Sequence, residues 1–310
     1  MLNRDIRILD LDGSIVKQTG LTGRFHTDIV DMRSLGPKAR FRLSDPTKDK
    51  IQEKLGASAK NSLTFLGSGD FHHVSNILIN QYNEPISVIG FDFHPDWDIL
   101  PPRLGCGSWV TETLKNNNIL KFVLAGVSSD DISSLRIQTG NLASLKNDRV
   151  EIYSYSHPPS LVMFKEVPRN TSIDIARNLF WTKIYWNELK GKDVHVIFTD
   201  IIKRIPTKSV YISIDKDCLI GDHALTNWEE GYMKLEELLS ILRLIKENLD
   251  IVGADVVGDY SDIHIEGRLK SALSYLDHPR RVRANAMTDD AITRINESTN
   301  IRIAELMTSQ

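Results

Sequence analysis

The sequence predicts a three-layer α/β/α fold, in which helices cover both faces of a mostly parallel sheet of about eight strands. The first observation is that apolar, β-branched runs recur along the chain with few polar interruptions, as in strands buried on both faces. The second is that longer segments with helical spacing of apolar residues separate these runs. Such alternation is typical of βαβ units. Because no low-complexity linker or repeat divides the chain, we expect one domain over residues 1–310.

Each strand is predicted where an apolar run stops at turn-forming or acidic residues. These strands are Asp5–Leu11, Leu63–Leu66, Ile86–Phe91, Phe122–Val127, Val150–Tyr155, Val194–Phe198, Val210–Ile214 and Ile251–Val257. Helices are predicted over Lys48–Leu55, His73–Tyr82, Trp109–Asn116, Ile175–Leu189 and Lys234–Asn248. Residues Thr19–Ser44 are turn-rich, so we expect irregular structure there. The segment after Asp262 is largely helical in pattern, and its basic run, Arg280, Arg281 and Arg283, is interpreted as a solvated helix face or a subunit contact.

The composition is that of an ordinary globular protein, with 41% hydrophobic and 25% charged residues. A formal net charge of −3 argues against a nucleic-acid partner, which usually requires a basic face. The two cysteines, Cys106 and Cys218, form neither a disulfide framework nor a zinc-ribbon spacing. No apolar run approaches the ~20 residues that span a bilayer, and the N-terminus lacks the pattern of a signal peptide. We therefore expect a cytoplasmic protein without a membrane partner.

Metal-binding side chains gather where three predicted strands end. The three groups are Asp70, His72 and His73; Asp92, His94 and Asp96; and Asp215 and Asp217. In an open α/β sheet, ligands bind outside the carboxyl ends of the strands. If the three ends lie side by side, with strands about 4.8 Å apart, these side chains share one small volume. Carboxylates held so close raise one another's pKa, and a bound cation removes that conflict.

The number and type of these side chains predict two metal ions. Together they offer more oxygen and imidazole ligands than one ion uses. Sites dominated by carboxylates with one or two histidines favour manganese or similar ions, whereas structural zinc sites normally include thiolates. Two ions about 3.5–4 Å apart lower the pKa of a bridging water toward neutral and so supply a hydroxide. The pattern therefore indicates metal-assisted hydrolysis of a small molecule.

Three motifs resemble those of the arginase–agmatinase (ureohydrolase) family. DFHPD, Asp92–Asp96, resembles the family's Asp-x-His-x-Asp motif, and SIDKD, Ser213–Asp217, resembles its Ser-x-Asp-x-Asp motif. GSGDFHH, Gly67–His73, resembles the Gly-Gly-Asp-His motif with an insertion. The motifs keep the family's order, each follows an apolar strand, and the resemblance covers roughly residues 60 to 260. It identifies the chain as a divergent member of that family with an arginase-like fold.

The resemblance implies a role for each motif residue. Asp92 and Asp215 would bridge two Mn²⁺ ions; Asp96 and either His72 or His73 would complete the first ion's shell, and His94 and Asp217 the second's. A hydroxide bridging the ions would attack the carbon of a linear C–N bond in a guanidino- or amidino-type substrate. Asp92 and Asp217 would be catalytic, with Asp217 or a nearby acid moving the proton. Family members are often trimers or hexamers, which makes a homo-oligomer an expectation here.

The chain also departs from the family pattern around the substrate. Family members that act on guanidines carry Glu-x-Asn-Pro after the last strand, and that glutamate binds the guanidinium. Here the aligned residues are Gly258–Ser261, and the segment Gly105–Val110 (GCGSWV) replaces a family His-Gly. The sequence offers Ser108, Glu229, Glu230 and Asp259 as candidate substrate-binding residues, and either glutamate could receive a cationic substrate.

Two other functions remain open from the sequence. ILDLDGSIV resembles the first motif of haloacid-dehalogenase-type phosphatases, with Asp10 as nucleophile and Asp12 as acid/base. A strand followed by a tight turn explains the same residues. The other alternative is a non-catalytic metal-binding protein of the same fold, because the family's glutamate and histidine are absent.

Overall fold

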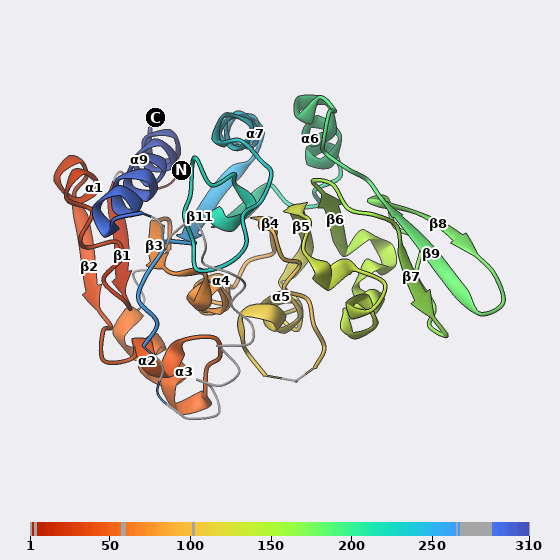
Figure 1. Cartoon of the computed structure of the whole chain (residues 1–310), viewed down its shortest axis with the longest axis horizontal. Helices are drawn as coiled ribbons and strands as arrows, with labels where there is room; N and C mark the ends of the chain where they lie inside the picture. Colours follow the sequence, from red (N-terminus) through yellow and green to blue (C-terminus); the bar gives the residue numbers. More distant parts are fainter. Residues whose placement is uncertain are drawn as a thin grey trace.

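The computed structural model describes residues 2, 5–56, 60–100, 103–264, 266 and 287–309. Within these residues, eight parallel strands form one sheet in the order β2-β1-β3-β11-β10-β4-β5-β6 (Figure 1). The strands are β1 (Ile6–Asp10), β2 (Thr27–Asp31), β3 (Leu63–Gly67), β4 (Ile86–Phe91), β5 (Ile119–Val127), β6 (Val150–Ser154), β10 (Ser209–Asp215) and β11 (Asp250–Val257). Strands β3 and β4 are buried at every position, which confirms the continuous apolar pattern.

Helices cover both faces of the sheet (Figure 1). One face packs against α2 (Gly36–Ala39), α3 (Asp45–Leu55), α4 (Ser75–Ile79) and α5 (Trp109–Thr113). The other packs against α1 (Thr19–Arg24), α6 (Val194–Lys203), α7 (Leu235–Asn248) and α9 (Asp289–Thr308). Each face has its own hydrophobic core, because alternate residues of one strand point to opposite faces, as Val88 and Ile89 do. These observations confirm the three-layer α/β/α prediction.

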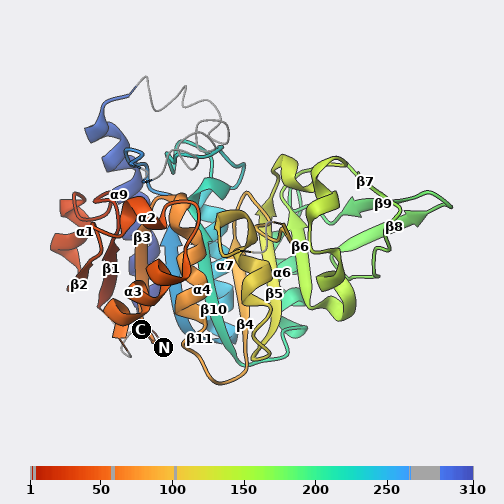
Figure 2. The same ribbon diagram turned by 90° about the horizontal axis from the view of Figure 1, so that it is seen from below.

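A second, smaller sheet lies beyond β6. It is antiparallel, with the order β7-β9-β8, and consists of β7 (Ser160–Met163), β8 (Ile173–Arg177) and β9 (Trp181–Trp186). Figure 2 shows it projecting from the end of the molecule opposite β2. The prediction of a helix over Ile175–Leu189 is therefore wrong. The strands follow a period of two, with Thr182, Ile184 and Trp186 buried between more exposed neighbours.

Two other predictions of local structure are wrong. Val194–Phe198 begins helix α6 instead of forming a strand: the Asp193 side chain caps the helix at the His195 amide, and the buried Phe198 and Ile201 share one helical face. Residues Thr19–Ser44 hold α1, α2 and the edge strand β2, whose polar surface gives no apolar run to detect. The basic run at Arg280, Arg281 and Arg283 lies outside the described residues. No helix in the described part of the chain is long and apolar enough to cross a bilayer.

Candidate metal centre

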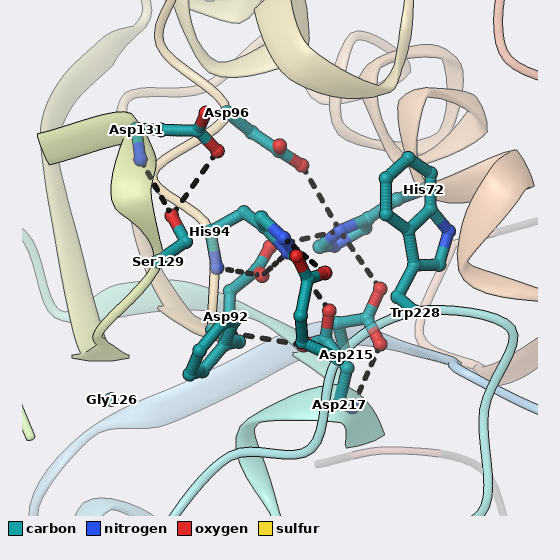
Figure 3. Close-up of polar contacts among 12 residues, drawn as sticks. His72, Asp92, His94, Asp96, Gly126, Ser129, Asp131, Asp215, Asp217 and Trp228 are labelled. Atoms are coloured by element: carbon teal, nitrogen blue, oxygen red, sulfur yellow. Dashed lines mark hydrogen bonds and ion pairs between the residues drawn. The ribbon is translucent and has the colours of Figure 1, made fainter. Parts of the chain in front are cut away.

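The motif residues meet at the carboxyl edge of the sheet. Strand β10 pairs directly with β4, so the DFHPD and SIDKD motifs lie side by side. Strand β11 separates β3 from β10, so the three strand ends are not all adjacent, contrary to the simplest expectation. The short 3₁₀ helix Gly69–Val74 after β3 spans this gap and carries His72 to the carboxylates. Figure 3 shows the acidic and imidazole side chains turned toward one another.

One group of ligand atoms surrounds the His72 ring. Its Nδ1 atom lies 3.1 Å from Oδ2 of Asp92, 3.4 Å from Oδ2 of Asp96 and 3.6 Å from Oδ2 of Asp215 (Figure 3). His72 and Asp92 are both almost completely buried. The indole N–H of Trp109 donates to Asp96 at 2.7 Å and orients that carboxylate. His72, Asp92 and Asp96 together could hold one metal ion.

A second group surrounds His94. Its Nδ1 atom lies 2.9 Å from Oδ2 of Asp217 and 3.7 Å from Oδ1 of Asp92. The backbone amides of Phe93 and His94 donate to Asp217 and Asp92, at 3.0 and 2.7 Å, and so fix both carboxylates. Asp92, His94 and Asp217 could hold a second ion. Asp92 belongs to both groups, which is the geometry that a bridging carboxylate requires.

Hydrogen bonds at Nε2 of His72, on the side of the ring away from the carboxylates, fix the orientation and the tautomer of the ring. The Ser213 hydroxyl lies 2.9 Å from Nε2 of His72 and donates to Oδ1 of Asp255 at 2.8 Å. Since the serine donates its only proton to Asp255, it accepts from Nε2–H, and Nδ1 of His72 keeps its lone pair when a cation binds. Tyr211 donates to the other Asp255 oxygen at 2.8 Å. Such a chain behind a histidine orients it as a metal ligand.

Burial and mutual repulsion shift the pKa values of these groups. Burial raises the pKa of Asp96 to about 7 and that of Asp217 to about 6, and the nearby Asp92 adds to both shifts. Burial alone would lower the pKa of His72 and His94, but the surrounding carboxylates outweigh it and raise both well above the ordinary value. Burial would also raise the pKa of Asp92, yet both imidazoles lower it to about 2. The metal-free cluster thus carries excess negative charge that protons or cations neutralise.

The cluster forms the floor of a cleft of about 380 Å³. Acidic residues dominate its lining, against the two basic residues Arg136 and His94: Asp92, Asp96, Asp98, Asp130, Asp131, Asp215, Asp217 and Glu229. Oε2 of Glu229 lies 3.2 Å from Nε2 of His94. The Trp228 ring packs edge-on against His94, with 5.4 Å between ring centroids. The shape and charge of this cleft suit a small cation.

Trp228 is held by a buried ion pair that the sequence did not reveal. Its indole N–H donates to Oδ1 of Asp70 at 2.9 Å, and the other Asp70 oxygen accepts from Nη1 of Arg40 at 2.5 Å. Arg40 also donates to the Ser261 hydroxyl at 2.8 Å. Asp70 therefore positions the cleft wall and belongs to neither cation group. In the sequence, Arg40 ends the segment Gly36–Arg40 (GPKAR), which does not indicate that Asp70 is its partner.

Most of the other predicted site residues lie outside the cleft lining. His73 is fully buried and belongs to neither cation group. The Ser108 hydroxyl donates to the Arg103 carbonyl at 2.6 Å, and Glu230 is exposed. The Asp259 carboxylate is buried, accepts from Gln18 at 2.6 Å and pairs with Lys216 at 2.8 Å. Of the four candidate substrate-binding residues, Glu229 alone lines the cleft.

Asp10 and Asp12, the phosphatase candidates, have structural partners. Asp10 accepts from Nε of Arg33 at 2.7 Å and from the Gly13 amide at 2.9 Å. Asp12 accepts from the Ser14 hydroxyl at 2.7 Å. Neither aspartate lines the cleft. The strand-and-turn interpretation explains these contacts.

Comparisons with known proteins find similarity over the part of the chain that contains the SIDKD motif. A family model described as the arginase family matches residues 164–261, a stretch that contains Asp215, Asp217 and β11. A curated relative from Thermotoga maritima, described as an uncharacterized protein, is 28% identical over 197 residues. That alignment covers 64% of this chain and 58% of the relative, so the chain matches less than two thirds of the relative's length.

Solved structures share the fold over nearly the whole chain. Formimidoylglutamase from Bacillus subtilis has a TM-score of 0.58 at 13% identity, covering 99% of this chain and 87% of that chain. Arginase from Bacillus subtilis has a TM-score of 0.54 at 12% identity, covering 99% of both chains. Formiminoglutamase from Trypanosoma cruzi, solved with Mn²⁺, has a TM-score of 0.53 at 11% identity, covering 99% and 94%. These matches confirm the arginase-like fold.

Proposed function

We propose that this chain, a divergent member of the arginase family, is a hydrolase that uses two manganese ions to cleave a linear C–N bond of a guanidino- or amidino-type small molecule. The matched structures include an arginase and formiminoglutamases, one of them solved with Mn²⁺. The pair of overlapping ligand groups around Asp92 supports the two-ion centre. The residues that would face the substrate differ from the family motifs.

One observation carries the proposal. Nδ1 of His72 and Oδ2 of Asp92 are buried, and neither forms a hydrogen bond with any group in the described part of the chain. They lie 3.1 Å apart, next to the carboxylates of Asp96 and Asp215. One imidazole cannot balance three buried carboxylates held this close, and a cation bound between them and Nδ1 of His72 would remove their mutual repulsion.

The donor atoms fit two ions of the manganese type. His72, Asp92, Asp96 and Asp215 would hold the first ion, and Asp92, His94, Asp215 and Asp217 the second. Both sets combine carboxylates with one imidazole, which suits manganese. Neither set contains a thiolate, and burial raises the pKa of the neighbouring Cys218 thiol well above its ordinary value. When bound, such a pair of ions supplies a hydroxide at neutral pH. We prefer His72 as the ligand because its ring contacts the carboxylates of Asp92 and Asp96.

The chain's own residues would bind the substrate and move its proton. Glu229 and Trp228 stand together at the mouth of the cluster, both against His94. A planar cation that lies over the Trp228 ring and faces the Glu229 carboxylate would gain both a cation–π contact and a charge-assisted hydrogen bond. Asp217, fixed by the Phe93 amide beside His94, is the carboxylate that we propose accepts the proton of the attacking water.

The test is hydrolysis of a panel of guanidino and amidino compounds by the manganese-loaded chain, measured as release of urea, ammonia or formamide. We expect turnover of at least one cationic member and loss of at least ~10³-fold in kcat for Asp217→Asn. Asp130→Asn, an exposed cleft carboxylate outside both cation groups, is the matched control and keeps kcat within about threefold. Full metal loading with no turnover across the panel would favour the non-catalytic alternative.

A further inference from the structure

The small sheet β7-β9-β8 presents an apolar face to solvent. In β7, Leu161 and Met163 are exposed, while Ser160 and Val162 are buried. In β9, Trp181 and Tyr185 are exposed on the same face, because Met163 pairs with Trp181 and side chains alternate along each strand. The exposed fractions are 38% for Leu161, 54% for Met163, 37% for Trp181 and 42% for Tyr185. The opposite face packs into the core through Val162, Ile184 and Trp186.

The apolar surface continues over the tip of this sheet. Phe164, Leu179 and Phe180 are 79%, 87% and 61% exposed. The tip has a defined structure, since the Asn178 side chain accepts from the amides of Phe180 and Trp181, both at 2.9 Å, and the Phe164 amide donates to the Phe180 carbonyl. Figure 2 shows the tip reaching away from the main sheet, so no part of the described chain lies over it.

The area of this surface decides which partner it fits. Together the seven side chains, Leu161, Met163, Phe164, Leu179, Phe180, Trp181 and Tyr185, expose on the order of 700 Å². The largest apolar patch of a typical monomer is about 300–600 Å². One side of a standard protein interface is about 800 Å², and two copies of this face, at about 700 Å² each, would bury about 1,400 Å² in contact. That total lies within the range of stable, specific dimers.

Charge on the same face also favours a copy of this chain over a charged partner. The outward-pointing charged residues are Asp174 and Lys183, which have opposite signs. The face therefore has no net charge with which to select an acidic or basic partner. Interfaces between identical subunits are the more apolar class, as this face is. Strand β8 is an edge strand, and no other strand of the described residues pairs with its outer side.

We propose that the outer face and tip of β7-β9-β8 form a two-fold interface with the same surface of a second copy of this chain. Each subunit would contribute the same apolar residues, so that residue i of one copy meets residue j of the other and the reverse. The metal cluster lies at the carboxyl edge of the large sheet, within one subunit. The interface therefore holds subunits together without completing the site.

Sedimentation velocity of the full chain at concentrations from about 1 to about 100 µM tests this proposal, a range that brackets the dissociation constants of ordinary specific dimers. We expect an assembly with an even number of copies, and we expect the double variant Leu179→Asp/Phe180→Asp to halve its mass. We expect Met163→Lys, which changes the outer face of β7 and leaves the tip intact, also to halve the mass of the assembly. Val196→Asp is the matched control, because Val196 is also an exposed apolar residue (60%) but lies on α6.

The unfolding temperature of each variant, measured by differential scanning fluorimetry, verifies that the isolated subunit stays folded. All four substituted residues are exposed, so little packing is lost. A chain that is still monomeric at the highest concentration would overturn the proposal and point to a different partner for this face. So would an odd-numbered assembly, or an assembly that persists in both the tip variant and the Met163→Lys variant.

Discussion

Gly258 leaves no room for a side chain beside Asp215. A Cβ atom at position 258 would lie 2.5 Å from Oδ1 of Asp215 and 2.7 Å from the Lys216 amide nitrogen. Gly258 also has a φ of +89°, which favours glycine. The motif resemblance aligns the family's guanidinium-binding glutamate with this position. The backbone here closes tightly on the proposed bridging carboxylate, and we therefore propose Glu229 as the residue that receives a cationic substrate.

Gly258→Ala tests this close contact. We expect the substitution to cost about 3 kcal/mol of unfolding free energy and to lower manganese affinity, because it strains the backbone and displaces Asp215. Chemical denaturation and metal titration measure the two effects. Gly191→Ala is the control: Gly191 has a φ of +71°, but a Cβ atom added there would meet no atom within 4 Å, so only the backbone cost of about 1–2 kcal/mol remains. Equal losses in the two variants would contradict the proposed contact.

The hydrogen bonds behind His72 give a second prediction. Ser213→Ala removes the acceptor for Nε2–H and frees the ring to adopt the other tautomer. We expect manganese affinity to fall about 10–100-fold, with the number of ions per chain unchanged at saturation. Isothermal titration calorimetry measures both quantities. Ser172→Ala, at a buried hydroxyl that bonds Asn170 and the Ile152 amide away from the cleft, is the control and leaves affinity unchanged.

The sequence was sufficient for the strands that carry the motifs. Strands β3, β4, β10 and β11 are buried along almost their whole length, so each is a continuous apolar run that ends near the cluster. Prediction failed where a segment lacks that signature. The first residues of α6 form an apolar run like that of a buried strand, and its helical periodicity becomes clear only when Ile201 is included. The apolar residues of β8 and β9 fall at positions that also fit the spacing of an amphipathic helix.

The stability of the metal-free chain should fall as pH rises. The pKa values of His72 and His94 are raised, and those of Asp96 and Asp217 are raised to about 7 and about 6. Each raised group stabilises the fold below its unfolded pKa and loses that contribution as pH rises through its folded pKa. The pKa of Asp92 is lowered to about 2, so its contribution to stability changes only between about pH 4 and about pH 2.

We therefore expect the unfolding temperature of chelator-treated protein to decrease by about 5 °C between about pH 5.5 and about pH 8.5. Manganese competes with the same protons, so the stabilisation that it gives should increase over that interval. Thermal scans with and without manganese at several pH values make the comparison. A metal-free unfolding temperature that rises with pH would contradict the proposed charge balance.

Glu229 supplies the prediction on substrate binding. Glu229→Gln keeps the size of the side chain but removes the negative charge, so KM for a cationic substrate should rise about tenfold. Metal content should stay at the wild-type value, because Glu229 contacts His94 through Nε2, whereas Nδ1 of the same ring faces Asp217. Glu230→Gln changes an adjacent, exposed carboxylate and should leave KM unchanged. Equal KM values for both variants would exclude Glu229 as the substrate-binding group.

Sequence motifs predicted which side chains converge on the cluster better than they predicted the residues of the cleft wall. His72, Asp92, His94, Asp96, Asp215 and Asp217 converge because each sits at or just after a strand end, where chain direction fixes their position. The cleft wall depends on the loop at Trp228, whose place is set by Asp70 and Arg40 from distant parts of the chain. No local pattern encodes such a contact. The sequence suggested Asp259 as a substrate-binding residue, but its carboxylate accepts a hydrogen bond from Gln18 and pairs with Lys216.

The most direct test of the central claim is a crystal structure of the manganese-soaked chain with anomalous diffraction data collected at the manganese absorption edge. We predict two anomalous peaks about 3.5 Å apart, with Asp92 between them, His72 on one and His94 on the other. The Asp92→Ala chain should lose at least one of the peaks. A fully loaded wild-type crystal with no peak among these residues, or with a single peak that Asp92 does not contact, would contradict the two-ion proposal.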